Sequence, residues 1–239
     1  MVHFTSVMGV YCCVIMLCLI LSWNNQIGRG LVIGFSTVLL INSLSVAKEL
    51  RRLQVELSSL FLGFEGERFV GQKLVDELMP YGFRVYHDIV LERQGRTFNV
   101  DHVVVGRNGV FAVETKTWRQ PKNARGEEER TITLHGDTMV IPSSIGEIES
   151  DKALQQAKRN ALVIHEELFG RNDESHWVIP VVALPGWRID LQRYGDVAVI
   201  SGQNNLRYFS KAGNCNYSDE VLGMIIARME QLASMEAHE

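Results

Sequence analysis

The sequence has few cysteines and no excess of positive charge, and both shortages exclude classes of protein. Of its 4 cysteines, Cys12, Cys13 and Cys18 fall in one apolar run and Cys215 stands alone. This spacing matches neither a disulfide framework nor a zinc cluster. With 24 basic and 28 acidic residues the formal net charge is −4. The chain is therefore not a general polyanion binder, and any contact with nucleic acid requires a local basic patch.

Charge is almost absent from the first 47 residues, where Arg29 is the one charged side chain. Two apolar runs of 17 residues, 7–23 and 31–47, occupy this region. Each is at the short end of what spans a bilayer core of about 30 Å. The short linker between them predicts a transmembrane helical hairpin over residues 1–47, embedded in the bilayer through 7–47. A cleaved signal peptide with one anchor, and a pair of soluble core helices, are the alternatives.

Basic residues directly after the second apolar run set the expected orientation. Lys48, Arg51 and Arg52 follow that run, whereas the linker carries only Arg29. Cationic flanks stay on the cytoplasmic side of a membrane. We therefore expect a multi-pass protein of the cell's inner membrane, with both termini and the large C-terminal domain in the cytoplasm.

An amphipathic linker helix is predicted at residues 48–62. Apolar residues three and four apart continue along it as Leu50, Leu53, Leu57, Leu60 and Phe64. This stripe predicts either a helix face that lies on its own domain or on lipid, or a homodimer through residues 50–64.

The rest of the chain, residues 63–239, predicts one domain that mixes helices and strands. The expected elements are a helix at 64–79, strands at 83–92, 98–105 and 110–117, short strands at 131–134 and 138–141, a helix at 151–169 capped by Gly170, strands at 177–184 and 197–201, and a helix at 218–236. This order predicts an α/β (α+β) fold with a mixed central β-sheet flanked by helices and preceded by two transmembrane helices.

Three charges interrupt the apolar hairpin between the second and third strands. The Asn-Gly dipeptide at 108–109 is a type I′ turn signal. With these two residues as the loop, opposite residues have numbers that sum to 217, so Asp101 faces Lys116. Asp101, Glu114 and Lys116 then share one face of the sheet. A four-residue loop at 106–109 changes the register but keeps the three side chains on one face, whereas a three-residue loop places them on different faces.

Two carboxylates and an ammonium on one face suit a divalent cation such as Mg²⁺, or Mn²⁺, which take hard oxygen ligands. Such an ion activates water and stabilises charge on a phosphate. The alternative is an ordinary cross-strand ion pair. Glu67 favours the metal site because it extends the inward face of the helix at 64–79, formed by Val70, Leu74 and Leu78. The alternative for Glu67 is a helix cap or a buried hydrogen-bonding group. Glycines at 63, 66 and 71 would let another element approach this helix closely.

These residues resemble a known family. "GxxGE" from Gly63, then "DHVVV", "NGVFAVETK" and a later helix bearing "QA", is similar to the nuclease-related domain (NERD) family of the PD-(D/E)xK nuclease superfamily. The resemblance covers the core motif region, 63–170, and implies a restriction-endonuclease-like sheet. It implies that Asp101 and Glu114 bind the metal, that Glu67 completes the metal shell and that Lys116 is the catalytic lysine.

The resemblance also implies roles for the helix at 151–169. Gln155 resembles a glutamine that relatives place near the substrate backbone, although "SDKALQQ" lacks their Asn-Pro and leaves Gln156 as the alternative. Lys158 and Arg159 would meet phosphates from the same helix; the alternative is a solvated helix surface. The segment "TWRQPKN" after Lys116 also departs from the family pattern.

Two kinds of function follow. The first is a membrane-anchored, Mg²⁺-dependent nuclease that hydrolyses phosphodiester bonds of DNA. The second is a catalytically silent module of the same fold that binds nucleic acid or tethers a partner to the membrane. A purely structural membrane protein would not explain the convergence of Glu67 with three further charges.

Overall fold

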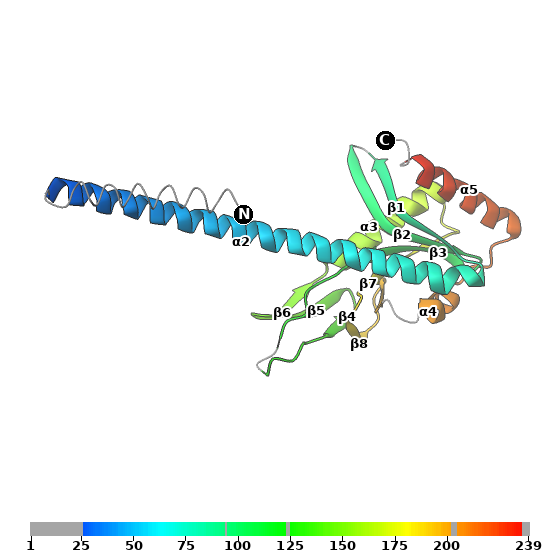
Figure 1. The fold of residues 1–239 in the computed structure, drawn as a ribbon. Coiled ribbons are helices and arrows are strands. Elements are labelled where there is room, and N and C mark those ends of the chain that lie inside the picture. Colours follow the sequence, from blue (N-terminus) through cyan, green and yellow to red (C-terminus); the bar gives the residue numbers. More distant parts are fainter. Residues whose placement is uncertain (1–25, 94, 123–124, 202–204, 236–239) are drawn as a thin grey trace. The chain divides into compact units, whose positions relative to one another are not determined.

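The computed structural model describes residues 26–93, 95–122, 125–201 and 205–235. Its elements are α2 (Gln26–Leu78), a 3₁₀ turn (Met79–Tyr81), β1 (Arg84–Arg93), β2 (Arg96–Gly106), β3 (Gly109–Thr115), β4 (Thr131–His135), β5 (Thr138–Ser143), β6 (Gly146–Ser150), α3 (Lys152–Phe169), β7 (Val178–Ala183), β8 (Arg188–Arg193), β9 (Ala198–Ile200), α4 (Asn205–Ala212) and α5 (Asp219–Met235) (Figure 1). The predicted mixed α+β fold class is confirmed.

Helix α2 is a single element where the sequence predicted a span, a linker helix and a third helix. It continues through Gly63 and Gly66 and ends before Pro80, as predicted. The chain nevertheless divides into two compact units, one up to Leu60 and one from Phe61. The predicted first apolar span, 7–23, lies outside the described residues.

The predicted second span falls within α2. Among the described residues, one helical stretch, Ile33–Tyr81, is long and apolar enough to cross a membrane, judged by length and composition. Its most apolar window is not buried, and large side chains such as Ile33 and Leu44 are exposed. The leucine stripe of residues 50–64 is exposed as well. A core helix would instead bury its apolar face.

A five-stranded sheet with the order β1-β2-β3-β7-β9 forms the centre of the second unit. The first three strands are antiparallel neighbours, and β7 and β9 add in parallel. All seven residues of β3 are buried because it is the middle strand and helices cover both faces.

Each face of this sheet has its own core. On one face α3 and α5 pack against Val103, Val105 and Ala112. On the other face α2 and α4 pack against Val104, Phe111 and Val113. The α2 side chains there are Val70, Leu74 and Leu78, all fully buried, as predicted for its inward face. Burial of each is worth about 1.5–3 kcal/mol, which holds this end of α2 on the sheet.

A second sheet, with the order β6-β5-β4-β8, occurs where a single sheet was predicted (Figure 1). Its two inner strands, β4 and β5, match the predicted short strands. Its outer strands were not predicted because β6 and β8 are largely exposed, so their sequences lack a clear apolar face. A third apolar core, which includes Ile132, Leu154 and Val182, joins this sheet to α3 and β7.

The β2–β3 hairpin has a register two residues away from the predicted one. Gly106 pairs with Gly109, so the loop is Arg107–Asn108. Opposite residues therefore sum to 215, and the prediction that Asp101 faces Lys116 is wrong. This register is the one that the longer loop gives. It keeps the predicted face, because a shift of two residues preserves the alternation of side chains.

The C-terminal segment holds this turn. A type I′ turn needs positive φ at both central residues, and neither Arg107 nor Asn108 has it. Instead, the backbone N–H groups of Cys215 and Tyr217 donate to the carbonyls of Asn108 and Arg107, at 3.1 and 2.9 Å. The Asn108 side chain donates to the carbonyl of Phe209 at 2.6 Å. Local turn chemistry alone therefore selected the wrong loop.

Candidate functional site

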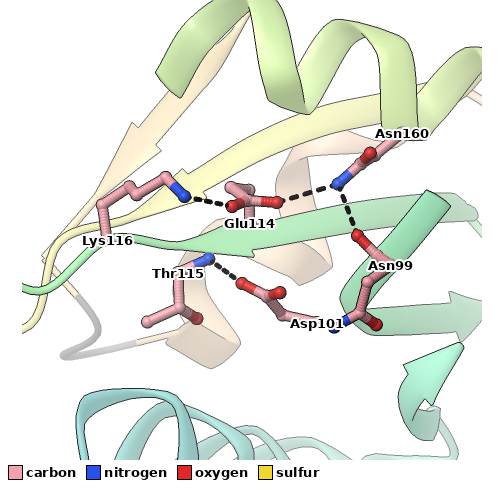
Figure 2. A network of polar contacts seen from close by, with 6 residues as sticks. All are labelled: Asn99, Asp101, Glu114, Thr115, Lys116 and Asn160. Carbon is pink, nitrogen blue, oxygen red and sulfur yellow. Dashed lines mark hydrogen bonds and ion pairs between the residues drawn. The ribbon is translucent and has the colours of Figure 1, made fainter. Parts of the chain in front are cut away.

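Asp101 and Glu114 lie together at one end of β2 and β3. The hairpin register, continued by one pair beyond His102, places them opposite one another. Their exposures are 8% and 1%, so both carboxylates are inside the fold. One Asp101 oxygen accepts a hydrogen bond from the backbone N–H of Thr115 at 2.7 Å (Figure 2). The other oxygen of Asp101 has no partner among the described residues.

Two side chains hold the carboxylate of Glu114, one at each oxygen. The Lys116 ammonium lies 2.6 Å from Oε1. The Asn160 amide nitrogen, from α3, donates to Oε2 at 2.8 Å and to the Asn99 carbonyl at 3.3 Å (Figure 2). Asn160 thereby ties α3 to both β2 and β3. Glu114 is fixed in place while Lys116 keeps 29% of its side chain exposed.

The cluster carries more negative charge than its one ammonium neutralises. Burial raises the pKa of Glu114 to about 7, with a further rise from Asp101, against the lowering effects of Lys116 and Asn160. Burial also raises the pKa of Asp101, and Asp88 adds to that rise. The N–H of Thr115 and the charge of Lys116 oppose it. Such an arrangement is destabilising unless a proton or a cation joins it.

Glu67 approaches this cluster from α2. Burial raises its pKa to about 7, and the charges of Asp101, Asp88 and Glu114 raise it further. The neighbouring Gly66 lets the helix come close, since a Cβ there would lie 1.9 Å from the Thr117 hydroxyl oxygen. The prediction that glycines permit a close approach is thus confirmed at Gly66. It is wrong at Gly63, which would have nothing within 4 Å.

Asp88 belongs to the same cluster and was missed in the sequence. It lies in β1 between two ladder pairs, His87 with His102 and Ile89 with Val100, and therefore opposite Asp101. Its φ is 53°, a conformation that aspartate tolerates better than most residues. The signal was an acidic residue within a strand of mostly apolar neighbours, the same signal that singled out Asp101.

Two cavities border the cluster. One, of about 480 Å³, is lined by Glu67, Asp88 and Asn99 among others. The other, of about 690 Å³, is lined by Lys116, Trp118, Arg119, Gln120, Pro121, Ile141, Pro142, Ser143, Ser144, Ile148, Ser150, Lys152, Ala153 and Gln156, and is called the Trp118 cavity below.

A histidine pair lies in the wall of the smaller cavity. The Nδ1 atoms of His87 and His102 are 2.9 Å apart. Burial lowers the pKa of both imidazoles, and His87 helps to bring that of His102 to about 3. Both rings are therefore neutral near pH 7 and bring no positive charge to the carboxylates.

The predicted substrate contacts of α3 lie in different surroundings. Gln155 is half-buried, whereas Gln156 lines the Trp118 cavity. The Lys158 ammonium forms ion pairs with Asp137 at 3.1 Å and Asp196 at 2.9 Å. Arg159 is exposed and forms no ion pair with any residue in the described ranges.

Asn160 was also missed. The buried face of α3 consists of Ala153, Leu154, Ala157, Asn160, Ala161, Val163 and Ile164. An amide in such an apolar face requires a buried polar partner. That requirement is the signal that would have identified it.

Within the parts of the chain that the structure describes, no group of three or more His, Cys, Asp or Glu side chains is close enough to hold a metal ion. Glu67, Asp101 and Glu114 therefore do not form a closed set of three ligands. Asp101 and Glu114 are the pair on which a site would be built, and Glu67 acts on that pair through its charge.

The fold and this cluster define a mixed α+β domain with two buried carboxylates and a lysine at one end of its central strands. The family model described as "nuclease-related domain" (NERD) matches residues 62–185, more than half of the chain. The chain therefore belongs to the nuclease-related domain family. Placement in the PD-(D/E)xK superfamily is consistent with this membership.

Comparison with other known proteins adds little. No curated protein matches the chain. One similar solved structure is a crystal structure of a protein of unknown function, AF1548, with 9% sequence identity. The match covers 71% of this chain and 99% of that one, with a TM-score of 0.31, which is too low to establish a shared fold.

Proposed function

We propose that this protein is a divalent-metal-dependent nuclease that hydrolyses phosphodiester bonds of DNA. The observation that carries the proposal is the pair of buried carboxylates, Asp101 and Glu114, with Lys116 beside them. Membership of a nuclease-related family supports it. A structural ion pair would be balanced in charge, whereas this cluster has more carboxylates than cations.

The donor set fits a hard divalent cation such as Mg²⁺ or Mn²⁺. Asp101 and Glu114 offer carboxylate oxygens, and burial raises the pKa of each, so a bound cation would stabilise their charged forms. Asp101 and Glu114 would hold the ion, and Glu67 would add negative charge near it. When bound, the cation would supply activation of water and neutralisation of charge on the phosphate.

The other groups of the site would position the two carboxylates and neutralise negative charge on the substrate. The N–H of Thr115 fixes Asp101, and Asn160 fixes Glu114, so neither carboxylate has to reorganise when substrate arrives. Lys116 lines the Trp118 cavity, and its ammonium would stabilise negative charge on a phosphate and orient the attacking water. Gln155 and Arg159 are proposed to contact the substrate backbone.

The second candidate is a silent module that binds nucleic acid or tethers a partner. The net charge of −4 and the absence of a three-ligand group among the described residues favour it. A family fold by itself does not establish activity.

We further propose that residues 7–47 anchor the protein in the inner membrane as a two-helix hairpin. The exposed apolar part of α2 supports this, and Lys48, Arg51 and Arg52 favour cytoplasmic termini and a cytoplasmic domain. Residues 63–239 then form the nuclease-related domain. The exposed stripe of residues 50–64 supports contact with lipid or with a second copy.

A cleavage assay tests the proposed activity. The full chain in detergent is incubated with plasmid and with single-stranded DNA, with Mg²⁺, with Mn²⁺ or with EDTA, beside Asp101→Ala and Lys116→Ala. We expect cleavage that needs the metal and that both substitutions remove. Equal cleavage by the variants would refute the assignment of the site. DNA binding without cleavage by any form would favour the silent module.

Protease treatment of sealed membrane vesicles tests the orientation. With the domain cytoplasmic, protease outside right-side-out vesicles leaves it intact, and protease outside inverted vesicles removes it. Digestion in right-side-out vesicles would reverse the proposed topology.

A further inference from the structure

The Trp118 cavity has features that the hydrolytic cluster does not need. It lies between the segment that follows Lys116, the β5–β6 hairpin and the first turns of α3. Its volume of about 690 Å³ is within the range of about 300–1,000 Å³ typical of small-molecule sites. Through Lys116, which lines it and pairs with Glu114, the cavity is joined directly to the carboxylates.

Trp118 gives the cavity a fixed aromatic surface. Its side chain is partly buried against the core that contains Ile132, Leu154 and Val182, so packing restrains the ring while the rest of it lines the cavity. Ile141 and Ile148 add apolar walls. A restrained indole that lines a cavity is suited to stacking on a flat ring.

The charged side chains that line the cavity are cationic, although the chain is acidic overall. Among the described residues that line it, Lys116, Arg119 and Lys152 are cationic and none is Asp or Glu. Side chains along β6 alternate between the two sides of the strand. Ile148 lines the cavity, so the carboxylates of Glu147 and Glu149 project away from it. The Lys152 side chain forms no ion pair with a described residue.

We propose that the Trp118 cavity binds an unpaired nucleotide of single-stranded nucleic acid, next to the phosphate at Lys116. This inference rests on the proposed function and names its substrate class. The base would stack on Trp118, and Lys152 would meet the adjoining phosphate. A base within a duplex is stacked on both sides and is not free to enter, so the cavity selects unpaired strands.

A binding assay on the full chain in detergent tests this inference. The probe is a fluorescein-labelled oligothymidylate, kept in EDTA so that it is not cleaved, and the competitor is the same strand paired with oligoadenylate. The test variants are Trp118→Leu and Lys152→Glu. The matched controls are Trp177→Leu and Lys211→Glu, which alter exposed residues outside the cavity. The melting temperature reports whether each variant is folded.

We expect both test variants to bind the single strand about tenfold more weakly, since stacking of a base and one phosphate contact each have roughly that value. The controls should bind as the unaltered chain does, and the duplex should compete poorly. Lys152→Glu changes an exposed residue and should therefore fold normally. It tests the inference on its own if Trp118→Leu does not fold. Wild-type affinity in Lys152→Glu, or equal competition by the duplex, would overturn the inference.

This assay separates the inference from the proposed function. If Asp101→Ala abolishes cleavage while Lys152→Glu binds normally, the nuclease assignment stands and the inference fails. If the unaltered chain never cleaves but its affinity depends on Trp118 and Lys152, the inference stands without the nuclease.

Discussion

Two carboxylate–lysine clusters among the described residues, one at the surface and one inside the fold, behave in opposite ways. At the surface, Lys158 lowers the pKa of Asp137, its partner in a cluster completed by Asp196. Inside the fold, the pKa of Glu114 rises to about 7 although Lys116 lies 2.6 Å away. Burial is the first cause of the rise at Glu114, and the charge of Asp101 adds to it. Water solvates the surface cluster, whereas the buried one needs another positive partner.

The largest expected difference between the two clusters is in the cleavage rate after one carboxylate is removed from each. Glu114→Gln keeps the shape of the side chain and should reduce the cleavage rate by about 10²–10³, because the charge that would hold the cation is lost. Asp137→Asn should leave the rate unchanged. Initial rates on plasmid with saturating Mg²⁺ measure both. A comparable loss in Asp137→Asn would show that the surface cluster also takes part.

The same pair of variants should have opposite effects on stability. Because the pKa of Glu114 is raised in the fold, its contribution to stability is present below about pH 4.5 and is lost as the pH rises to about 7. Without metal at pH 8, Glu114→Gln should therefore be more stable than the unaltered chain, by up to about 3 kcal/mol.

Asp137 follows the reverse rule, because its pKa is lowered and its contribution is lost as the pH falls through that lowered value. At pH 8, Asp137→Asn should be less stable by under about 1 kcal/mol. Thermal unfolding in EDTA at pH 4.5 and pH 8 measures both variants. A melting temperature of Glu114→Gln that is lower than normal at pH 8 would show that the buried charge is already balanced.

Asn160 offers a further comparison, because it is a side-chain amide that holds Glu114, whereas in the surface cluster the second donor to Asp137 is the backbone N–H of Asp196, at 3.3 Å. Asn160→Ala leaves one oxygen of Glu114 without its donor. We expect the Mg²⁺ concentration for half-maximal cleavage to rise by about tenfold, as is usual when a residue that orients a metal ligand is lost. A titration with Mg²⁺ separates this from a folding defect, which would lower the maximal rate without moving the midpoint.

Lys158 should give the smallest effect. Both of its carboxylate partners occupy the ammonium, so Lys158→Ala is expected to change DNA affinity little and stability by under about 1 kcal/mol. Arg159→Ala should reduce affinity more, because Arg159 is exposed and forms no ion pair with a residue that the structure describes. Binding of labelled DNA at low salt compares them. A greater loss of DNA affinity in Lys158→Ala than in Arg159→Ala would show that Lys158 contacts the substrate.

Elements with a strong local pattern were predictable from the sequence. The apolar period of α3, its Gly170 cap and the two-residue alternation of β2 and β3 placed Asp101 and Glu114 on one face before any register was known. The mixed fold class followed from the order of such elements.

What the sequence hid depends on contacts between distant residues. Asp88 joins the cluster only because β1 pairs with β2, and Asn160 only because α3 crosses the sheet. The second sheet was hidden because its outer strands are exposed and lack an apolar face. The turn was misplaced because residues about 100 positions later hold it, and no local propensity contains that information.

The hydrogen bonds from Cys215 and Tyr217 to the β2–β3 turn affect the order in which the chain folds during synthesis. Cys215 and Tyr217 are made about 100 residues after Arg107 and Asn108, so these hydrogen bonds cannot form while the hairpin leaves the ribosome. Contacts so distant in sequence form late in folding. A newly made chain would thus complete its hairpin only after Cys215 and Tyr217 have been synthesised.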